Sequence, residues 1–218
     1  MQVEQLSTAS GAVIEGPLLI TPRIFGDDRG FFFESWNQQS FASALEADGQ
    51  PIPSFVQDNH SRSSRGVLRG LHYQLQPHPQ GKLVRCVLGE IFDVAVDIRH
   101  GSPTCGHWVG ARLSAENHQQ LWVPVGFAHG FITLSEHAEV LYKTTDFWSR
   151  EWERSLRWDD PELAITWPLE ALAGALPQLS EKDAAAPLLA EVGEELLGCV
   201  WSSVRSVQTA DASRTGAP

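Results

Sequence analysis

Between residues 55 and about 148, this chain repeats one pattern, strand after strand. Residues 92–98 (FDVAVDI) and residues 138–143 (AEVLYK) alternate with a period of two, the spacing that sends successive side chains to opposite faces of a β-sheet. Gly, Pro and Asn residues separate these segments. Regularly spaced strands of this kind predict an all-β protein, which is a sandwich, a barrel or a jelly roll.

Other elements are expected on either side of these strands. A turn at residues 26–30 leads into an aromatic strand over residues 31–36, and residues 38–48 are typical of a short helix. Residues 150–186 contain three prolines and predict an irregular segment. Apolar residues at helical spacing predict an amphipathic helix over residues 187–205, and we expect the small, polar residues 206–218 to be disordered.

The composition limits the classes of function. A chain of 218 residues can bury a full core as one domain. Its net charge of −11 argues against general nucleic-acid binding, although the basic residues between positions 29 and 85 allow a local cationic pocket. No apolar run approaches the ~20 residues of a membrane span, and residues 1–4 lack the features of a secretion signal. The three cysteines are far apart, so we expect a cytoplasmic protein without disulfides.

The sequence GVLRGLHYQ at residues 66–74 places His72 three residues after Arg69 in a segment that is typical of a strand. An accessible histidine can move protons near neutral pH, and an arginine binds phosphate through charge-assisted hydrogen bonds. Together with residues 80–85 (QGKLVR) and 124–131 (PVGFAHGF), this segment predicts a buried, cationic pocket. Positions 69 and 72 face opposite sides of a regular strand, so both side chains can enter one pocket only if the strand bends or bulges, and we expect this at Gly70.

The pattern Pro-x-Gly-x-x-His that ends at His129 resembles half of the metal site of cupin barrels. The other half requires His-x-His followed by a glutamate, whereas this chain has His72-Tyr73-Gln74 and no glutamate at the required spacing. Too few nitrogen and oxygen ligands remain for a transition metal, so we expect no catalytic metal. His129 is then either a structural histidine of the barrel or a pocket residue that contacts the substrate.

Longer motifs resemble the dTDP-4-dehydrorhamnose 3,5-epimerase family, a metal-free branch of the cupins. The resemblance covers about residues 15–190 and rests on the segments above and on residues 26–35, 55–61, 89–99, 102–104, 121–131, 142–143 and 182–187. It implies a cupin-type jelly-roll barrel with short peripheral helices at residues 1–190, and a homodimer. The match fades near residue 190, so we expect residues 191–218 to form a C-terminal extension that has no counterpart in the family. The resemblance also implies cofactor-free epimerisation at C3 and C5 of dTDP-4-dehydro-6-deoxy-D-glucose, which gives dTDP-4-dehydro-L-rhamnose.

The chemistry of this reaction explains the residues that the resemblance assigns to it. A ketone at C4 acidifies the hydrogens at C3 and C5, so inversion needs a base on one face of the sugar, an acid on the other and a group that stabilises the enolate. The resemblance implies that His72 is the base and that Asp183 orients its ring. Tyr142 matches the acid of the family, and an unperturbed tyrosine, with a pKa of ~10, is protonated at neutral pH and able to donate. Lys82 is implied to stabilise the enolate oxygen.

The resemblance also implies a set of substrate-binding residues. Two arginines are assigned to the pyrophosphate, which they would hold through charge-assisted hydrogen bonds. Glu34 and Phe31 are assigned to the thymidine end, either from the same chain or from the partner subunit. Trp148 stands where the family usually carries a tyrosine, and an aromatic ring there can pack against base or sugar. The complete implied set is Arg29, Phe31, Glu34, Gln57, Asn59, Arg69, His129 and Trp148.

Other functions stay open at this point. A single-centre epimerase, which inverts C3 or C5 of a dTDP-4-keto-6-deoxysugar for another pathway, would use the same base. A 3,4-ketoisomerase would have different motifs around the histidine. A catalytically inactive sugar-nucleotide-binding or storage cupin would need neither the acid nor the base, and the incomplete His-x-His motif argues against a metal-dependent oxygenase.

Overall fold

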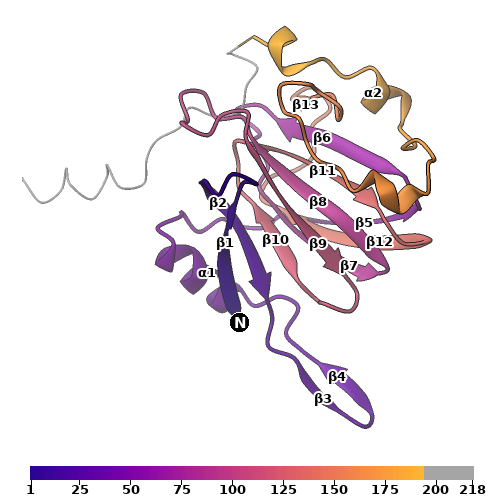
Figure 1. The fold of residues 1–218 in the computed structure, drawn as a ribbon. Coiled ribbons are helices and arrows are strands. Elements are labelled where there is room, and N and C mark those ends of the chain that lie inside the picture. The colour runs from indigo at the N-terminus through magenta and orange to yellow at the C-terminus, as the bar shows by residue number, and fades with distance from the viewer. Residues whose placement is uncertain (194–218) are drawn as a thin grey trace, which may run out of the picture.

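In a computed structural model that describes residues 1–193, the chain forms two facing antiparallel β-sheets with short helices on the outside (Figure 1). The predicted all-β jelly roll is confirmed. The six-stranded sheet contains, in spatial order, β1 (Gln2–Ser7), β2 (Val13–Thr21), β10 (Gln120–Val123), β7 (Lys82–Leu88), β12 (His137–Thr144) and β5 (Gln57–Ser64). The five-stranded sheet contains β13 (Glu153–Ser155), β6 (Leu68–Gln74), β11 (Phe127–Thr133), β8 (Glu90–Asp97) and β9 (Trp108–Ser114).

Three layers of apolar side chains hold the sheets in place. The inner faces of the two sheets meet in a core that includes Ile14, Val84, Ile91, Leu121 and Val140. Burial of such side chains is the main favourable contribution to folding, at roughly 25 cal/mol per Å² of apolar surface. The period-two segments predicted at residues 92–98 and 138–143 lie in β8 and β12, so one set of their side chains enters this core.

The outer face of the five-stranded sheet is covered by the irregular segment that follows β13. This segment contains the 3₁₀ helix η1 (Leu169–Leu172), the short helix α2 (Glu181–Ala184) and the 3₁₀ helix η2 (Leu189–Glu191). Its Leu156, Trp167 and Leu172 pack with Leu68 and Ile132 of the sheet. The segment therefore places α2 beside β6, where it contributes to the site described below.

The outer face of the six-stranded sheet is covered by α1 (Gln38–Ala47), as predicted from residues 38–48. The side chain of Asn37 caps the helix by accepting a hydrogen bond from the Ser40 backbone N–H at 3.1 Å. Phe41 and Leu45 on the buried face of α1 join a third apolar cluster with Leu18, Ile20, Leu83 and Trp122.

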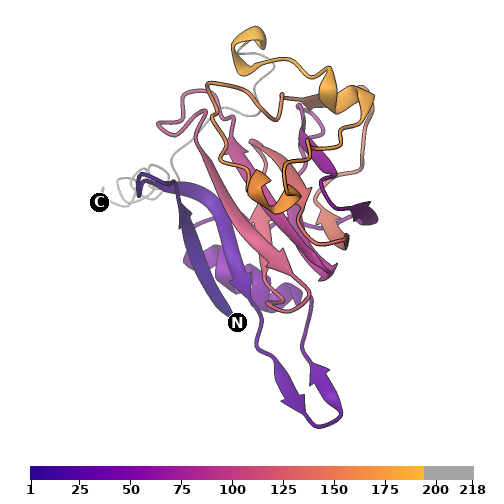
Figure 2. The same cartoon turned by 45° about the vertical axis from the view of Figure 1, so that its right-hand side comes forward.

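A two-stranded hairpin, β3 (Phe25–Asp27) and β4 (Gly30–Phe32), projects away from both sheets (Figure 2). The aromatic strand predicted over residues 31–36 is therefore shorter than expected, since it ends at Phe32. The hairpin pairs with neither large sheet, so no neighbouring strand extends it. Phe31 and Phe32 are exposed, at 63% and 67%.

The predicted helix at residues 187–205 begins within the described residues only as η2, after which Val192 is extended. The remainder of that helix and the tail at residues 206–218 lie outside the described residues. The boundary at residue 190 stays a prediction.

Candidate active site

A cavity of about 310 Å³ lies between the two sheets. It brings together most of the side chains that were predicted from separate motifs. The six-stranded sheet contributes Gln57, Asn59, Ser61, Lys82 and Tyr142, and the five-stranded sheet contributes Arg69, His72, His129, Phe131 and Glu153. Gln80 and Trp148 complete the lining from connecting segments.

Arg69 and His72 both enter the cavity because β6 bulges at Gly70. Arg69 pairs with Phe131 and His72 pairs with His129, so three steps along β6 match two along β11. Gly70 has φ +128°, and a Cβ on it would lie 2.5 Å from the Cα of Gly130. Only glycine fits this close approach of two backbones, and the bend predicted at Gly70 is confirmed.

His72 forms a hydrogen-bonded pair with Asp183 of α2. Nε2 of His72 donates to Oδ1 of Asp183 at 2.6 Å, and Oδ2 accepts from the hydroxyl of Ser180, the N-cap of α2, at 2.8 Å. Burial would raise the pKa of Asp183, but the hydrogen bonds from His72 and Ser180 and the charge of His72 lower it overall. The carboxylate is therefore ionised at neutral pH, and because Nε2 donates to it, Nδ1 carries the free lone pair and can accept a proton.

Lys82 supplies a buried positive charge next to His72. Its Nζ donates to the backbone carbonyl of His72 at 3.3 Å. Burial lowers the pKa of Lys82 to about 8, although the charges of Glu153 and Asp93 act to raise it. An ammonium ion in a water-poor cavity can stabilise a developing oxyanion strongly.

Tyr142 lies on the wall opposite His72, since β12 belongs to the six-stranded sheet and β6 to the five-stranded sheet. Burial raises the pKa of Tyr142, with a smaller opposing contribution from the charge of Arg69. Its hydroxyl is therefore protonated at neutral pH and can donate. A group that can accept a proton therefore lies on one wall of the cavity, and a group that can donate one lies on the other.

His129 forms a second, more deeply buried pair. Nε2 of His129 donates to Oδ1 of Asp93 at 2.7 Å. Burial lowers the pKa of His129, while the charge and hydrogen bond of Asp93 act in the opposite direction. His129 is therefore neutral at pH 7 and is suited to hydrogen bonding rather than to supplying charge.

The polar rim of the cavity is held by its own hydrogen bonds. Gln57 donates to Oδ1 of Asn59 at 2.9 Å and accepts from the backbone N–H of Trp148 at 3.1 Å. These bonds tie the segment that contains Trp148 to β5. They place an aromatic side chain and two amide groups at one side of the cavity.

Glu153 is the lining residue that sequence reasoning missed most clearly. Burial would raise its pKa, but a hydrogen bond from Lys182 and the charges of Lys182 and His72 lower it overall. It lies on β13, a strand of three residues, which is too short for a period-two pattern to be recognised. Gln80, Ser61 and Phe131 also line the cavity without having been assigned a role.

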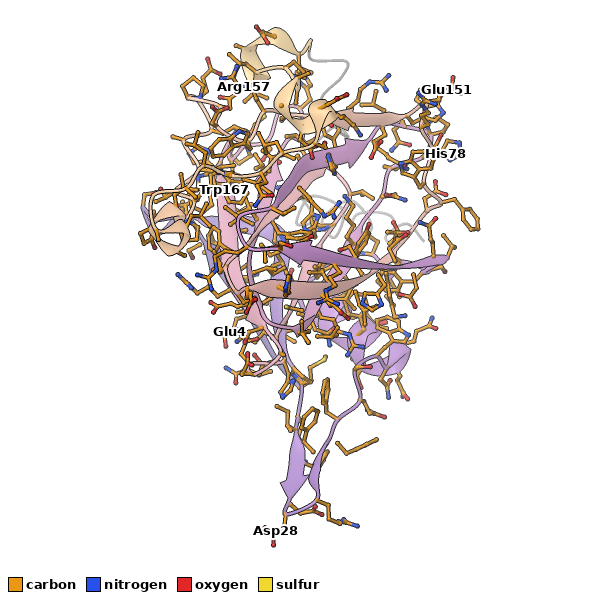
Figure 3. The ribbon with its side chains drawn as sticks, turned by 90° about the vertical axis from the view of Figure 1, so that its right-hand side faces the viewer. Glu4, Asp28, His78, Glu151, Arg157 and Trp167 are labelled. Carbon is orange, nitrogen blue, oxygen red and sulfur yellow. The ribbon has the colours of Figure 1, made fainter. Side chains whose placement is uncertain are left out.

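The hairpin residues do not reach the cavity of their own chain. Arg29 lies at the hairpin turn beside Asp27, and its side chain is 89% exposed. Figure 3 shows the neighbouring Asp28 at the far tip of the molecule. Glu34 lines a separate cavity of about 430 Å³ at the base of the hairpin. Three of the predicted site residues therefore lie away from the cavity of their own chain: Arg29, Phe31 and Glu34.

Two further features concern residues 1–193 as a whole. In this part of the chain, no three His, Cys, Asp or Glu side chains converge to form a site for a metal ion. No helix among these residues is both long and apolar enough to cross a membrane.

Comparison with known proteins identifies relatives of this arrangement. The sequence profile of the dTDP-4-dehydrorhamnose 3,5-epimerase family matches residues 12–191. The dTDP-4-dehydrorhamnose 3,5-epimerase of Pseudomonas aeruginosa is 65% identical over 175 residues, which cover 80% of this chain and 92% of that protein.

Solved structures have the same fold. The dTDP-6-deoxy-D-glucose-3,5-epimerase of Legionella pneumophila, in complex with dTDP-4-keto-L-rhamnose, has a TM-score of 0.82 and 50% identity, and the match covers 92% of this chain and all of that chain. A 3'-monoepimerase from Streptomyces bikiniensis, in complex with dTDP-quinovose, has a TM-score of 0.78 and 34% identity, and covers 90% of this chain and 96% of that chain.

Proposed function

Because this chain belongs to the dTDP-4-dehydrorhamnose 3,5-epimerase family, we propose that it inverts C3 and C5 of dTDP-4-dehydro-6-deoxy-D-glucose. The product is dTDP-4-dehydro-L-rhamnose, an intermediate on the way to dTDP-L-rhamnose. One observation carries this proposal: His72 and Tyr142 face one cavity from opposite sheets, and the ammonium group of Lys82 lies beside His72.

The first step is removal of a proton from a carbon next to the C4 ketone. Nδ1 of His72 takes this proton, and Asp183 stabilises the imidazolium that forms through its bond to Nε2. The electron pair moves onto the C4 oxygen, where Lys82 stabilises the negative charge. C3 and C5 both flank this ketone, so one base and one enolate-stabilising group serve both centres.

Inversion requires that the proton return from the opposite face. We assign this role at C5 to Tyr142, whose hydroxyl stays protonated because burial raises its pKa. Exchange with solvent needs only the base and water, whereas a change of configuration also needs a donor on the other face. Tyr142→Phe should therefore retain exchange at C3 while inversion at C5 falls, and unchanged product stereochemistry would remove this assignment.

The nucleotide part of the substrate requires further contacts. Arg69 at the cavity suits the pyrophosphate, because a guanidinium binds phosphate oxygens through charge-assisted hydrogen bonds. We propose that Arg29, Phe31 and Glu34 act on the partner subunit's site in a homodimer, since the hairpin projects from its own chain with exposed aromatic side chains. Sedimentation of a single monomeric species at assay concentration would overturn this dimer.

We place the reaction in the cytoplasm, where reduced thiols persist. The two cysteines within the described residues, Cys86 and Cys105, are free.

The deciding experiment follows the sugar by NMR. The protein is incubated in D₂O with dTDP-4-dehydro-6-deoxy-D-glucose, and a downstream reductase traps the product. Deuterium at both C3 and C5 with the L-lyxo product is expected. Deuterium at one carbon alone would favour a single-centre epimerase, which is the activity named for the Streptomyces bikiniensis structure. No exchange would favour a binding protein or a different substrate.

A further inference from the structure

Asp93 is a buried carboxylate that lies behind the cavity wall. The proposed reaction gives this residue no role. It lies on β8 and is 0% exposed. Oδ1 accepts the hydrogen bond from His129, whereas Oδ2 is buried and has no hydrogen-bond partner within residues 1–193. A carboxylate that is buried and half-satisfied reduces stability, so its presence in a core strand points to a functional role.

The neighbouring strand positions make this carboxylate more unusual. Val94 and Val96 face the outer core and Ala95 faces the inner core, and all three are fully buried. Asp93 has the same inward parity as Ala95, which directs its side chain between the sheets towards the cavity. An apolar residue there would add to the core, so packing alone does not account for an aspartate.

Geometry connects Asp93 to the site, because its Oδ1 accepts from His129, which lines the same cavity as Lys82, and the charge of Asp93 favours the ammonium form of Lys82. The titratable and charged side chains around Lys82 come from every wall of the cavity: Asp93 on β8, His129 on β11, Arg69 and His72 on β6, Glu153 on β13, Tyr142 on β12 and Lys182 on α2. Glu153 is paired with Lys182, which offsets its charge. His129 is neutral at pH 7, because burial lowers its pKa, so it does not offset the charge of Asp93.

We propose that Asp93 is a positioning residue for this site: its charge keeps Lys82 in the ammonium form, and its bond to Nε2 of His129 leaves Nδ1 of that ring as an acceptor for the substrate. Asp93 does not touch the substrate and acts through its two neighbours. The effect of Asp93 on catalysis rests on the proposed function, but the effect of its charge on the protonation of Lys82 can be tested without substrate. Because the pKa of Lys82 is lowered to about 8, the loss of a single carboxylate charge would change the fraction of Lys82 that is protonated near neutral and alkaline pH.

The first test is the pH dependence of kcat/KM for Asp93→Asn, which keeps the side-chain shape and removes the charge. We expect the alkaline limb to move to lower pH and the acid limb to stay in place. A drop of one unit in the pKa of Lys82, from about 8, would reduce activity at pH 9 relative to pH 6.5 by about sevenfold. A uniform loss at every pH would overturn the proposal, because that is the signature of a structural role.

A matched control is Asp160→Asn, which also alters a buried carboxylate. Asp160 accepts hydrogen bonds from the backbone N–H groups of Glu162, Leu163 and Leu189 and does not line the cavity. Its substitution should lower stability without moving the alkaline limb. An equal shift in both variants would overturn the proposal.

The second test needs no catalysis. ¹³C NMR follows the titration of the Lys82 Cε signal, assigned by its absence in Lys82→Arg. The midpoint should be lower in Asp93→Asn than in the wild type and unchanged in Asp160→Asn, and an unchanged midpoint in Asp93→Asn would overturn the inference. If the wild type shows no turnover, the proposed function fails, yet this titration still tests Asp93.

A third measurement uses the wild type alone and covers the case in which Asp93→Asn does not fold. Long-range ¹H–¹⁵N spectra distinguish a protonated ring nitrogen from one with a free lone pair. For His129 we expect a proton on Nε2 and a free lone pair on Nδ1 between pH 6 and 8. The opposite tautomer, or an imidazolium throughout this range, would overturn the assignment.

Discussion

The cavity contains two histidine–carboxylate pairs that are almost identical in geometry. His72 and His129 lie directly opposite each other on β6 and β11. Each donates from Nε2 to a carboxylate oxygen, at 2.6 Å to Asp183 and at 2.7 Å to Asp93. The surroundings differ: the side chain of His72 is 28% exposed, that of His129 is 8% exposed, and of the two carboxylates only Asp183 has both oxygens hydrogen-bonded within the described residues.

This difference shows that the surroundings of a pair, rather than its internal geometry, determine its chemistry. A partly exposed ring next to a fully hydrogen-bonded carboxylate can accept a proton, pass it on and return to its starting state. Burial lowers the pKa of His129, so the second ring stays neutral and acts as a fixed hydrogen-bonding group. In the proposed mechanism, one fold therefore uses the same two residue types for proton transfer and for positioning.

The largest expected effect separates the two histidines. His72→Ala should lower kcat by about 10³-fold or more, because the base is lost, while His129→Gln should lower it by about 10-fold. Both are measured by deuterium incorporation at C3 and C5, with circular dichroism to check the fold. Wild-type exchange in His72→Ala would remove His72 as the base, and equal losses in the two variants would end the distinction between the pairs.

The next effect concerns the place where the paired strands β6 and β11 bring their backbones close together. Gly70→Ala puts a Cβ 2.5 Å from the Cα of Gly130, on a residue with φ +128°. Overpacking and backbone strain together should reduce the free energy of unfolding by about 3 kcal/mol or more. Urea unfolding measures this loss, with Gly174→Ala as the control, since that glycine also has positive φ but a Cβ added to it would meet no atom within 4 Å. Similar losses would mean that backbone strain alone, and not the close approach to the Gly130 backbone, requires glycine at position 70.

Asp183→Asn should reduce kcat by about 10²-fold, because the imidazolium loses its ionised partner. The variant should also change how stability depends on pH. The folded pKa of Asp183 is lowered, so the carboxylate stabilises the fold above its unfolded pKa of about 3.9, and this contribution disappears as the pH falls through the folded value. The difference in unfolding free energy between wild type and variant should therefore be present at pH 6 and shrink towards pH 3. A difference that grows on acidification would contradict the assigned sign.

The sequence predicted the parts of this site that lie on long strands. Period-two alternation placed β8 and β12 correctly, and the opposite parity of Arg69 and His72 was enough to locate the bulge at Gly70. The reason is that strand alternation is a local property, which each segment displays without its neighbours.

The remaining features depend on contacts that no local pattern encodes. Asp183 is 111 residues from His72, and α2 has four residues, so their pairing came from the family resemblance rather than from spacing. Glu153 was missed because β13 is too short to show a period. The aromatic run at residues 31–36 has strand propensity, but propensity does not say whether a sheet is present to pair with it, and the hairpin ends at Phe32.

The smallest expected effect on kcat concerns the hydrogen bond to Oδ2, the second carboxylate oxygen of Asp183. Ser180→Ala removes the hydroxyl that donates to Oδ2 of Asp183 at 2.8 Å and leaves His72 and Oδ1 in place. Asp183 would then resemble Asp93, with one oxygen bonded and one without a partner among the described residues. We expect kcat to fall by about three- to tenfold, in line with the loss of one hydrogen bond of typical net strength, and the pKa of Asp183 to rise. Because Ser180 also caps α2, Ser180→Gly is the control that keeps much of the cap while removing the same hydroxyl. Equal losses in both variants would assign the effect to the hydrogen bond on Oδ2, whereas a loss confined to alanine would show that the cap, and not the second oxygen, distinguishes the two pairs.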